Sequence, residues 1–235
     1  MLKDFTIFEN SLEELPNQKL LINTINAYSY VMSKKDTLFK KSLIESDLLI
    51  PDGISIVWAV RFLFGKKITK IAGADLFYYE MNKLNKTGGK CFFLGSSQDT
   101  LDKIVSKSKI EFSKVQVDVF SPPYKAEFSD EENTEMIAKV NASNPDVLFI
   151  GMTAPKQEKW AYKHYDKLKI EAHIGSIGAV FDFYAGKVNR APKWMIKIGL
   201  EWLYRLLKEP KRMWKRYVLG NTQFIYAILR EKLSN

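Results

Sequence analysis

The sequence predicts an α/β fold: a Rossmann-like, mostly parallel sheet with helices on both faces, followed by a basic, amphipathic helical appendage. Two observations support this prediction. Short apolar runs alternate with longer segments of helical periodicity, and strands that are apolar throughout are typical of parallel sheets covered on both faces. The net charge of +9 lies entirely from residue 187 onward, where twelve Lys/Arg oppose three Asp/Glu, whereas the preceding residues hold 24 of each sign.

The predicted elements alternate along the chain. We expect strands at residues 20–26, 47–53, 90–94, 116–120, 146–150 and 172–175. We expect helices at residues 27–46, 54–64, 75–84, 100–112, 130–141 and 155–167, and residues 178–184 follow the last strand. Because ligands bind beyond the carboxyl ends of parallel strands, the polar and glycine residues that follow four of these strands should line one cleft.

The composition changes from Pro192 onward. Trp194, Ile198, Trp202 and Leu206 recur at helical spacing between basic residues, and Pro210 interrupts the pattern, so we expect two or three amphipathic helices. We therefore divide the chain into a catalytic domain, 1–190, and a membrane-associating appendage, 191–235. A membrane interface fits the interleaved Trp, Leu and Arg best. Helices that only pad the core, or a nucleic-acid surface without a recognisable binding module, are the alternatives.

Several classes of site are disfavoured by the sequence. A single cysteine, Cys91, excludes an intramolecular disulfide, and its apolar surroundings indicate a buried thiol. His164 and His173 lack metal-ligand spacing and are interpreted as structural. No Asp-x-Asp motif is present to hold a metal on a sugar nucleotide, so cationic side chains and helix dipoles should neutralise a leaving diphosphate. We expect neither a metal nor a cofactor, and no Walker motif indicates ATP chemistry.

Three loops that follow predicted strands are candidate site segments. Gly95-Ser96-Ser97 precedes a helix whose first amides could hold phosphate, or it is an ordinary capped turn. Asp52, in the turn Pro51-Asp-Gly53, could act as a general base, although the local sequence alone favours a turn residue that bonds its own backbone. The segment 153–158 could present Lys156 and Gln157 to a pyrophosphate or a sugar, or it is a simple helix cap.

A series of motifs resembles one known family. The motifs are, in order, Thr24-Ile-Asn26, Pro51-Asp-Gly53, Gly73-Ala-Asp75-Leu76, Pro155-Lys-Gln-Glu158, Gly178-Ala-Val-Phe-Asp-Phe183, Arg190-Ala-Pro192, Gly199-Leu-Glu-Trp-Leu-Tyr-Arg205, Glu209-Pro-Lys-Arg212 and Arg216-Tyr217. They resemble the WecG/TagA/CpsF glycosyltransferases, family 26, over about residues 20–220. The C-terminal motifs are the most specific part of this resemblance.

The resemblance implies an inverting, metal-independent transferase. Its expected donor is a UDP-sugar, with N-acetylmannosamine or its uronic acid as the best candidates, and its acceptor is a polyprenyl-diphosphate-linked saccharide used for teichoic acid or other surface polysaccharides. The implied catalytic residues are Asp52 as the base with Thr24, Asn26 and Gln157. The expected substrate and nucleotide contacts are Gly53, Gly95, Ser96, Gly151, Lys156, Glu158, Gly178 and Asp182. The expected diphosphate and membrane contacts are Arg190, Arg205, Arg212 and Arg216.

Two departures and several alternatives remain open. Thr69-Lys70 stands where many relatives have an arginine, and Gly151-Met-Thr-Ala-Pro155 is two residues longer than the usual loop. UDP-glucose, mannose or glucuronic acid donors, or a non-catalytic sugar-nucleotide-binding scaffold, are alternatives. No secretory signal or spanning apolar stretch is evident, so we expect a cytoplasmic protein on the inner face of the plasma membrane. Nucleic acid is not an expected partner, and the apolar appendage also allows a homo-oligomer.

Overall fold

The computed structural model describes residues 1–234, with the side chains of all of them except Lys193 and Arg212. One six-stranded sheet runs through the molecule in the order β2-β1-β6-β5-β3-β4, and every pairing is parallel. The strands are β1 (Leu20–Ile25), β2 (Leu48–Pro51), β3 (Lys90–Gly95), β4 (Gln116–Phe120), β5 (Val147–Gly151) and β6 (His173–Ser176). The predicted fold class is confirmed.

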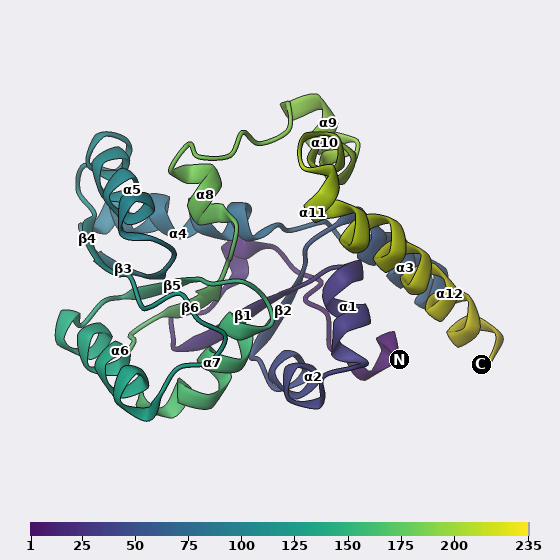
Figure 1. The fold of residues 1–235 in the computed structure, drawn as a ribbon, viewed down its shortest axis with the longest axis horizontal. Coiled ribbons are helices and arrows are strands. Elements are labelled where there is room, and N and C mark those ends of the chain that lie inside the picture. Colours follow the sequence, from purple (N-terminus) through teal and green to yellow (C-terminus); the bar gives the residue numbers. More distant parts are fainter. Residues whose placement is uncertain (235) are drawn as a thin grey trace.

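Helices cover both faces of the sheet and continue into a long C-terminal helical segment (Figure 1). Those before the C-terminal segment are α1 (Ala27–Ser33), α2 (Thr37–Ile44), α3 (Ile54–Phe64), α4 (Gly73–Thr87), α5 (Gln98–Glu111), α6 (Asp130–Ser143), α7 (Lys156–His164) and α8 (Val180–Tyr184). The C-terminal helical segment consists of α9 (Lys193–Lys197), α10 (Glu201–Lys208), α11 (Pro210–Trp214), a π-helical segment (Lys215–Leu219) and α12 (Gly220–Leu233). Short 3-10 turns lie at Leu2–Asp4, Leu12–Glu14 and Tyr165–Lys167.

The side chains of the strands point alternately to the two faces of the sheet and contribute to three apolar clusters. Leu20 and Ile22 of β1 pack with α4, α5 and α8, whereas Leu21 between them faces α6 and α7 on the other side. A third cluster joins α1, α2 and α3 to α12 at one end of the sheet. Cys91 is fully buried in the first cluster, as its apolar surroundings predicted. The strands are therefore fixed on both faces, and their carboxyl ends share one edge.

Two helical predictions differ from the structure. The segment 27–46 forms two helices because Asp36 accepts a hydrogen bond from the backbone N–H of Phe39 and so begins α2. The C-terminal segment forms four α-helices and a π-helical segment, more than the two or three expected. Pro210 does mark a break: α10 ends at Lys208, and Pro210 begins α11 at a position where its missing N–H costs nothing.

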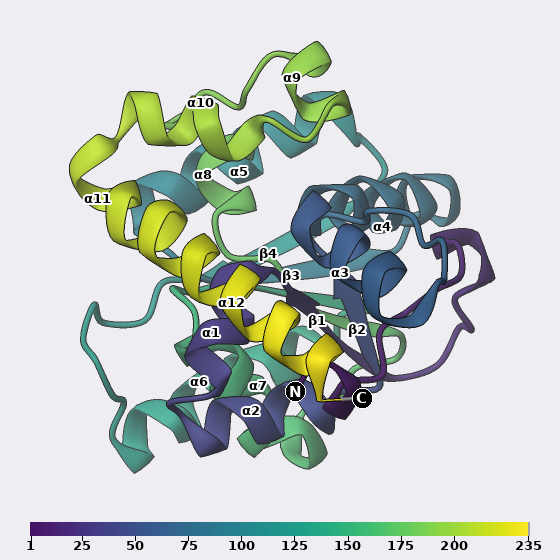
Figure 2. The same cartoon turned by 90° about the vertical axis from the view of Figure 1, so that its right-hand side faces the viewer.

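The last helix is attached firmly to the body of the protein. Phe224 and Ile228 of α12 are buried against α1, and Phe224 meets the ring of Tyr30 edge-on at 5.2 Å. Glu231 is buried and accepts hydrogen bonds from the backbone N–H groups of Leu2 at 2.6 Å and Lys3 at 3.0 Å. In Figure 2, α12 runs across the face formed by α1 and α3, and the two chain ends lie close together.

Candidate active site

One large cavity opens at the carboxyl edge of the sheet. It has a volume of about 1550 Å³, which exceeds the roughly 300–1,000 Å³ of a typical small-molecule site. Residues that follow β1, β2, β3, β5 and β6 line one side, and α3, α10, the π-helical segment and α12 line the other. The cavity therefore lies where the parallel topology places a ligand, and it has room for more than one substrate.

The structure brings nearly all predicted site residues together in this cavity. Its lining includes Thr24, Asn26, Asp52, Gly53, Ser96, Gly151, Lys156, Gln157, Glu158, Gly178, Asp182, Arg190, Arg205 and Arg216. Gly95 is the exception among the described residues: it is buried at the end of β3 and pairs with Gly151 of β5 instead of lining the cavity. The side chain of Arg212 lies outside the part that the structure describes.

Asp52 follows the last residue of β2, and its backbone N–H donates to the carbonyl of Ile25. Within residues 1–234, its half-buried carboxylate has no hydrogen-bond partner among the described side chains, so it differs from the self-bonded turn residue that the local sequence favoured. Burial raises the pKa of the Asp52 carboxyl to about 6, and the negative charge of Glu201 adds to the rise. Lys70 and Arg216 oppose the rise. Such a carboxylate is largely ionised at neutral pH and more basic than an ordinary aspartate.

A backbone turn presents Asp52 to the cavity. Gly53 has φ +131°, a conformation that L side chains rarely adopt, and it precedes the first residue of α3. Gly199, between α9 and α10, has φ +79°, and a Cβ there would lie 3.0 Å from the side chain of Ile54. The C-terminal segment therefore approaches the start of α3 closely, next to the carboxylate.

Asn26 and Gln157 are held by the protein itself. Asn26 caps α1: its side-chain oxygen accepts from the N–H of Ser29 at 3.0 Å, and its own N–H donates to the Ser29 hydroxyl. Gln157 is buried, accepts from the N–H of Met152 at 3.2 Å, and donates to a carboxylate oxygen of Glu158 at 2.9 Å. These two amides shape the cavity wall, and the Gln157 amide orients the carboxylate of Glu158.

Buried polar atoms in the cavity lack protein partners. These atoms are Oε2 of Glu158, Nε of Arg205 and Nε of Arg216, none of which has a hydrogen bond to the described residues. Burial raises the pKa of Glu158 to about 7, against the hydrogen bond from Gln157 and the positive charge of Arg216. Unpaired buried polar groups are rare and costly, so their concentration here is typical of a site that awaits a polar ligand.

The arginines of the C-terminal segment differ in their contacts. Arg190 is held by Glu201, with Nε 3.0 Å from one carboxylate oxygen. Arg205 lies 5.2 Å from the ring centre of Phe183, and Arg216 lies 5.1 Å from that of Tyr28. The charge of Arg216 lowers the pKa values of both Asp52 and Glu158. Arg205 and Arg216 thus keep charge available for a ligand, whereas Arg190 is neutralised by Glu201.

The loop after β3 forms the opposite end of the cavity. Ser96 adopts φ +60°, which is uncommon for a residue other than glycine, and its carbonyl accepts a hydrogen bond from the Ser121 hydroxyl at 2.8 Å. The side chain of Ser97 caps α5, as one of its two interpretations predicted. Lys187 reaches Ser97 and pairs with Asp99 at 2.7 Å. This end of the cavity therefore holds the Lys187–Asp99 ion pair.

Several lining residues were not predicted from the sequence. Lys70, Lys187 and Glu201 reach the cavity from loops or from α10, and Trp58, Phe62, Ile225 and Leu229 line it from α3 and α12. One available signal was the nearly continuous apolar character of residues 54–64, because a helix that is apolar all round must be covered or must bind something. His173, by contrast, is structural as expected and bonds Glu80 at 2.6 Å in the core.

The described part of the chain contains neither a metal-binding cluster nor a membrane-spanning helix. Across residues 1–234, no cluster of three or more His, Cys, Asp or Glu side chains has an arrangement suited to a metal ion. The same residues contain no helix with the length and apolarity needed to cross a bilayer.

Comparison with known proteins assigns the family. Residues 5–235 match the model of the family described as "Glycosyl transferase WecG/TagA/CpsF family". A Bacillus subtilis (strain 168) protein named N-acetylglucosaminyldiphosphoundecaprenol N-acetyl-beta-D-mannosaminyltransferase is 31% identical over 212 residues, which cover 90% of this chain and 80% of that protein. A protein of the same name from Bacillus spizizenii (strain ATCC 23059 / NRRL B-14472 / W23) is 30% identical over 233 residues, 97% of this chain and 87% of its own length. With the match spanning both the sheet and the C-terminal helices, this chain belongs to the WecG/TagA/CpsF family of glycosyltransferases.

Proposed function

We propose that this glycosyltransferase transfers N-acetylmannosamine, or its uronic acid, from a UDP-sugar to a polyprenyl-diphosphate-linked saccharide, with inversion and without a metal. The observation that carries the proposal is the carboxylate of Asp52, which lies in the cavity with a pKa of about 6 and without a hydrogen-bond partner among the described residues. The sugar and the acceptor follow the names of the two Bacillus relatives. The UDP moiety follows the family resemblance.

The proposed reaction is a single displacement. A hydroxyl of the acceptor attacks the anomeric carbon of the donor sugar, and its proton passes to a carboxylate oxygen of Asp52. The bond between that carbon and the diphosphate oxygen breaks, and UDP leaves with the electron pair on the opposite face of the sugar. A base with a pKa near the working pH suits such a proton transfer.

The departing diphosphate needs positive charge. Arg205 and Arg216 supply it in the proposed mechanism, since the structure leaves their Nε atoms without protein partners. Fixed cations in a partly desolvated cavity stabilise charge that develops in the transition state. Lys156 adds charge beside the loop after β5, and Lys187, paired with Asp99, lies beside the loop after β3; we place the nucleotide near these two loops.

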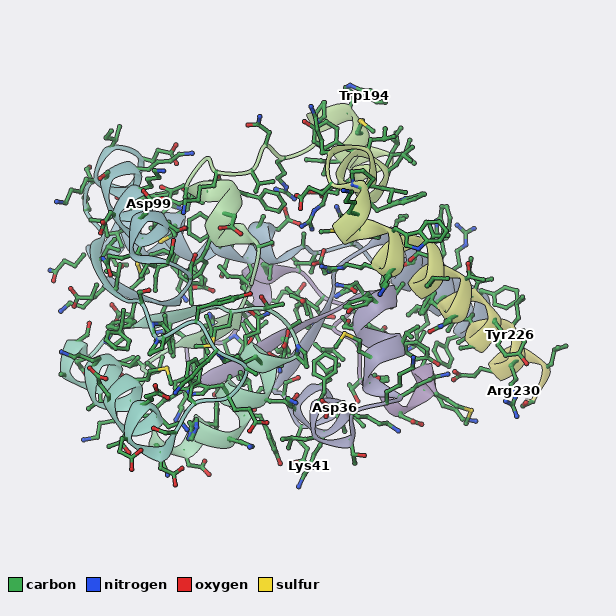
Figure 3. The ribbon with its side chains drawn as sticks, in the orientation of Figure 1. Asp36, Lys41, Asp99, Trp194, Tyr226 and Arg230 are labelled. Atoms are coloured by element: carbon green, nitrogen blue, oxygen red, sulfur yellow. The ribbon has the colours of Figure 1, made fainter. Side chains whose placement is uncertain are left out.

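The C-terminal segment is proposed to bring the enzyme to its acceptor. We divide the chain into a catalytic domain, 1–190, and an appendage, 191–235, that contacts the inner face of the plasma membrane. In support, Trp194, Leu207 and Trp214 are 63%, 72% and 51% exposed, among the basic residues of this segment. Trp194 lies at the outer end of the segment, away from the sheet (Figure 3). Interfacial Trp beside Lys and Arg suits an anionic lipid surface.

The decisive experiment replaces the base. Asp52→Asn removes the proton acceptor and keeps the shape of the side chain, so turnover with a polyprenyl-diphosphate-linked N-acetylglucosamine should fall about 10²–10⁴-fold. UDP affinity, measured by calorimetry, should stay close to wild type and thereby show that the variant is folded. Asp102→Asn, an exposed carboxylate on α5 outside the cavity, is the matched control. Wild-type turnover by Asp52→Asn would overturn the assignment of the base.

A donor panel tests the substrate. Mass spectrometry of products from UDP-linked N-acetylmannosamine, glucose, mannose and glucuronic acid should show transfer of the hexosamine first. Binding of UDP-sugars without any product would instead favour the non-catalytic scaffold.

A further inference from the structure

An apolar groove leads out of the cavity between α3 and α12. Residues 54, 55, 58, 59 and 62 of α3 line the cavity, and so do residues 221, 224, 225, 228 and 229 of α12. Each set occupies one face of its helix. Both helices begin beside the site, near Asp52 and Arg216, and both run away from it (Figures 1 and 2).

The groove has a buried floor and exposed walls. Ala59, Phe224 and Ile228 form the floor and are at most 6% exposed. The walls are Trp58 and Phe62 on α3, at 66% and 48% exposure, and Ile225 and Leu229 on α12, at 57% and 50%. Large apolar side chains that gather along a concave surface and stay open to water are typical of a binding site.

We propose that this groove binds the first isoprene units of the acceptor's polyprenyl chain. The proposal rests on the proposed function, because it takes the acceptor to be a lipid diphosphate. The occupant is inferred from the fact that the groove is continuous with the catalytic cavity. At its inner end the groove opens onto the cations Lys70 and Arg216 beside Asp52, so one molecule could place its diphosphate there and its lipid between the helices.

The dimensions agree with a short stretch of isoprenoid. The lining positions of α12 extend from Asn221 to Leu229, a helix length of roughly 12 Å at 1.5 Å per residue. At the outer end, Nζ of Lys232 lies 5.7 Å from the ring centre of Phe62. The groove is therefore apolar except at its inner end, where Ser55 and Asn221 lie, and it carries a cation at its mouth, where a longer chain would continue into the bilayer.

A concave groove also differs from the surface that a membrane alone would contact. A flat bilayer reaches protruding side chains such as Trp194 of α9, but it would not fill the floor formed by Ala59, Phe224 and Ile228. Membrane contact and groove binding can therefore be separated by experiments without lipid vesicles.

The first test measures binding without sugar chemistry. In detergent-free buffer, calorimetry should show that farnesyl diphosphate binds at least ~10-fold more tightly than isopentenyl diphosphate, because its additional isoprene units bury apolar surface. In the double variant Phe62→Ser/Ile225→Ser, this preference should fall to about 2-fold, since both walls lose their apolar surface. Ile110→Ser, which removes an exposed apolar side chain of α5 outside the cavity, should keep the full preference.

The second test uses turnover. N-acetylglucosaminyl diphosphate linked to a C15 chain should have a higher kcat/KM than the C5 analogue, and the double variant should lose most of this advantage. An enzyme that gives no product with either acceptor while retaining the farnesyl preference would contradict the proposed function but not the groove.

Three results would overturn the groove proposal. One is a wild-type protein that binds both diphosphates equally. Another is a double variant that keeps the full farnesyl preference and loses only its binding to vesicles of anionic phospholipid, which would make the groove walls a membrane contact. The third is a dimer that the double variant converts to monomers in sedimentation while the farnesyl preference stays intact, which would make this face a subunit interface.

Discussion

The two sides of the cavity are built in different ways. On the sheet side, residues that follow β3, β5 and β6 line the cavity, and these strands are buried on both faces. On the other side, long side chains of α10 and the π-helical segment reach in from elements that have no fully buried residue of their own. The first side has a fixed shape, whereas the second is rich in charge.

Charge follows the same division. Residues before 187 balance to zero, and the net charge of +9 comes entirely from the C-terminal part of the chain. The segment 191–219 touches the body near Ile54 and through the Arg190–Glu201 pair, but α12 beyond it is anchored by Phe224, Ile228 and Glu231. The segment therefore places its arginines over the cavity, where Arg205 and Arg216 also contact Phe183 and Tyr28 of the body.

Among the variants that test this contrast, the largest effect is expected at Arg216, on the cationic side. Arg216→Ala should lower kcat about 10²–10³-fold, as loss of one fixed group that stabilises transition-state charge typically does. Arg216→Lys should recover only part of the loss, because lysine keeps the charge but not the planar fork. Steady-state kinetics with saturating donor is the measurement, and the neighbouring exposed Lys215→Ala is the control. Equal activity in Arg216→Ala and the control would show that this side does not act on the leaving group.

A smaller effect is expected at Gly151, on the sheet side. A Cβ there would lie 2.4 Å from the ring of Phe181, so Gly151→Ala should lower the free energy of unfolding by about 1–3 kcal/mol through overpacking. Urea denaturation measures this change. Adding Phe181→Leu should restore part of the stability, because the smaller side chain makes room for the methyl group.

The matched glycine is Gly186. It has φ +73° and no atom within 4 Å of a built Cβ, so Gly186→Ala should cost only about 1 kcal/mol of backbone strain. A Gly151→Ala variant no less stable than Gly186→Ala would mean that the sheet side can yield to a packing change, and the contrast between the two sides would be weaker than we describe.

Most of the fold could be predicted from the sequence because buried parallel strands are recognisable as apolar runs. Residues 116–120 and 54–64 form the expected strand and helix with the expected bounds. The division at Asp36 was missed because it depends on a single side-chain cap within a continuous helical pattern. The extra helices after Pro192 were missed because α9 and α11 have only five residues each, too few for a clear helical pattern.

The site was predictable where it follows strand ends and less so where distant residues meet. Asp52 and Gly151 lie at strand ends, so topology alone places them together. Glu201 and Lys70 reach the cavity only through tertiary packing, and no local pattern indicates that Glu201 would hold Arg190 and act on Asp52. Gly95 was expected to contact the ligand, but a Cβ there would lie 2.7 Å from the carbonyl oxygen of Gly151, so this glycine serves close strand packing.

The smallest expected effect is a shift in the pH dependence of kcat/KM, which depends on residues from both sides of the cavity. Asp52 must be deprotonated to accept a proton, so kcat/KM should rise with pH through about 6 and fall as the pH drops below it. Glu201 raises the pKa of Asp52 by its negative charge, and Glu201→Gln should therefore move this acid limb to lower pH, by up to about one unit. Weakening the Arg190–Glu201 pair acts in the same direction, because Arg190 and Asp52 attract each other.

Glu158, whose pKa is raised to about 7, is the other carboxyl that could produce such a limb. In Glu158→Gln the limb near pH 6 should persist if it belongs to Asp52, and Glu135→Gln, an exposed carboxylate on α6 outside the cavity, should leave the whole profile in place. An acid limb that stays at the same pH in Glu201→Gln, or that moves to higher pH, would show that the negative charge of Glu201 does not raise the pKa of Asp52. The cationic segment would then act on the leaving group alone, and the sheet side would set the basicity of Asp52 by burial.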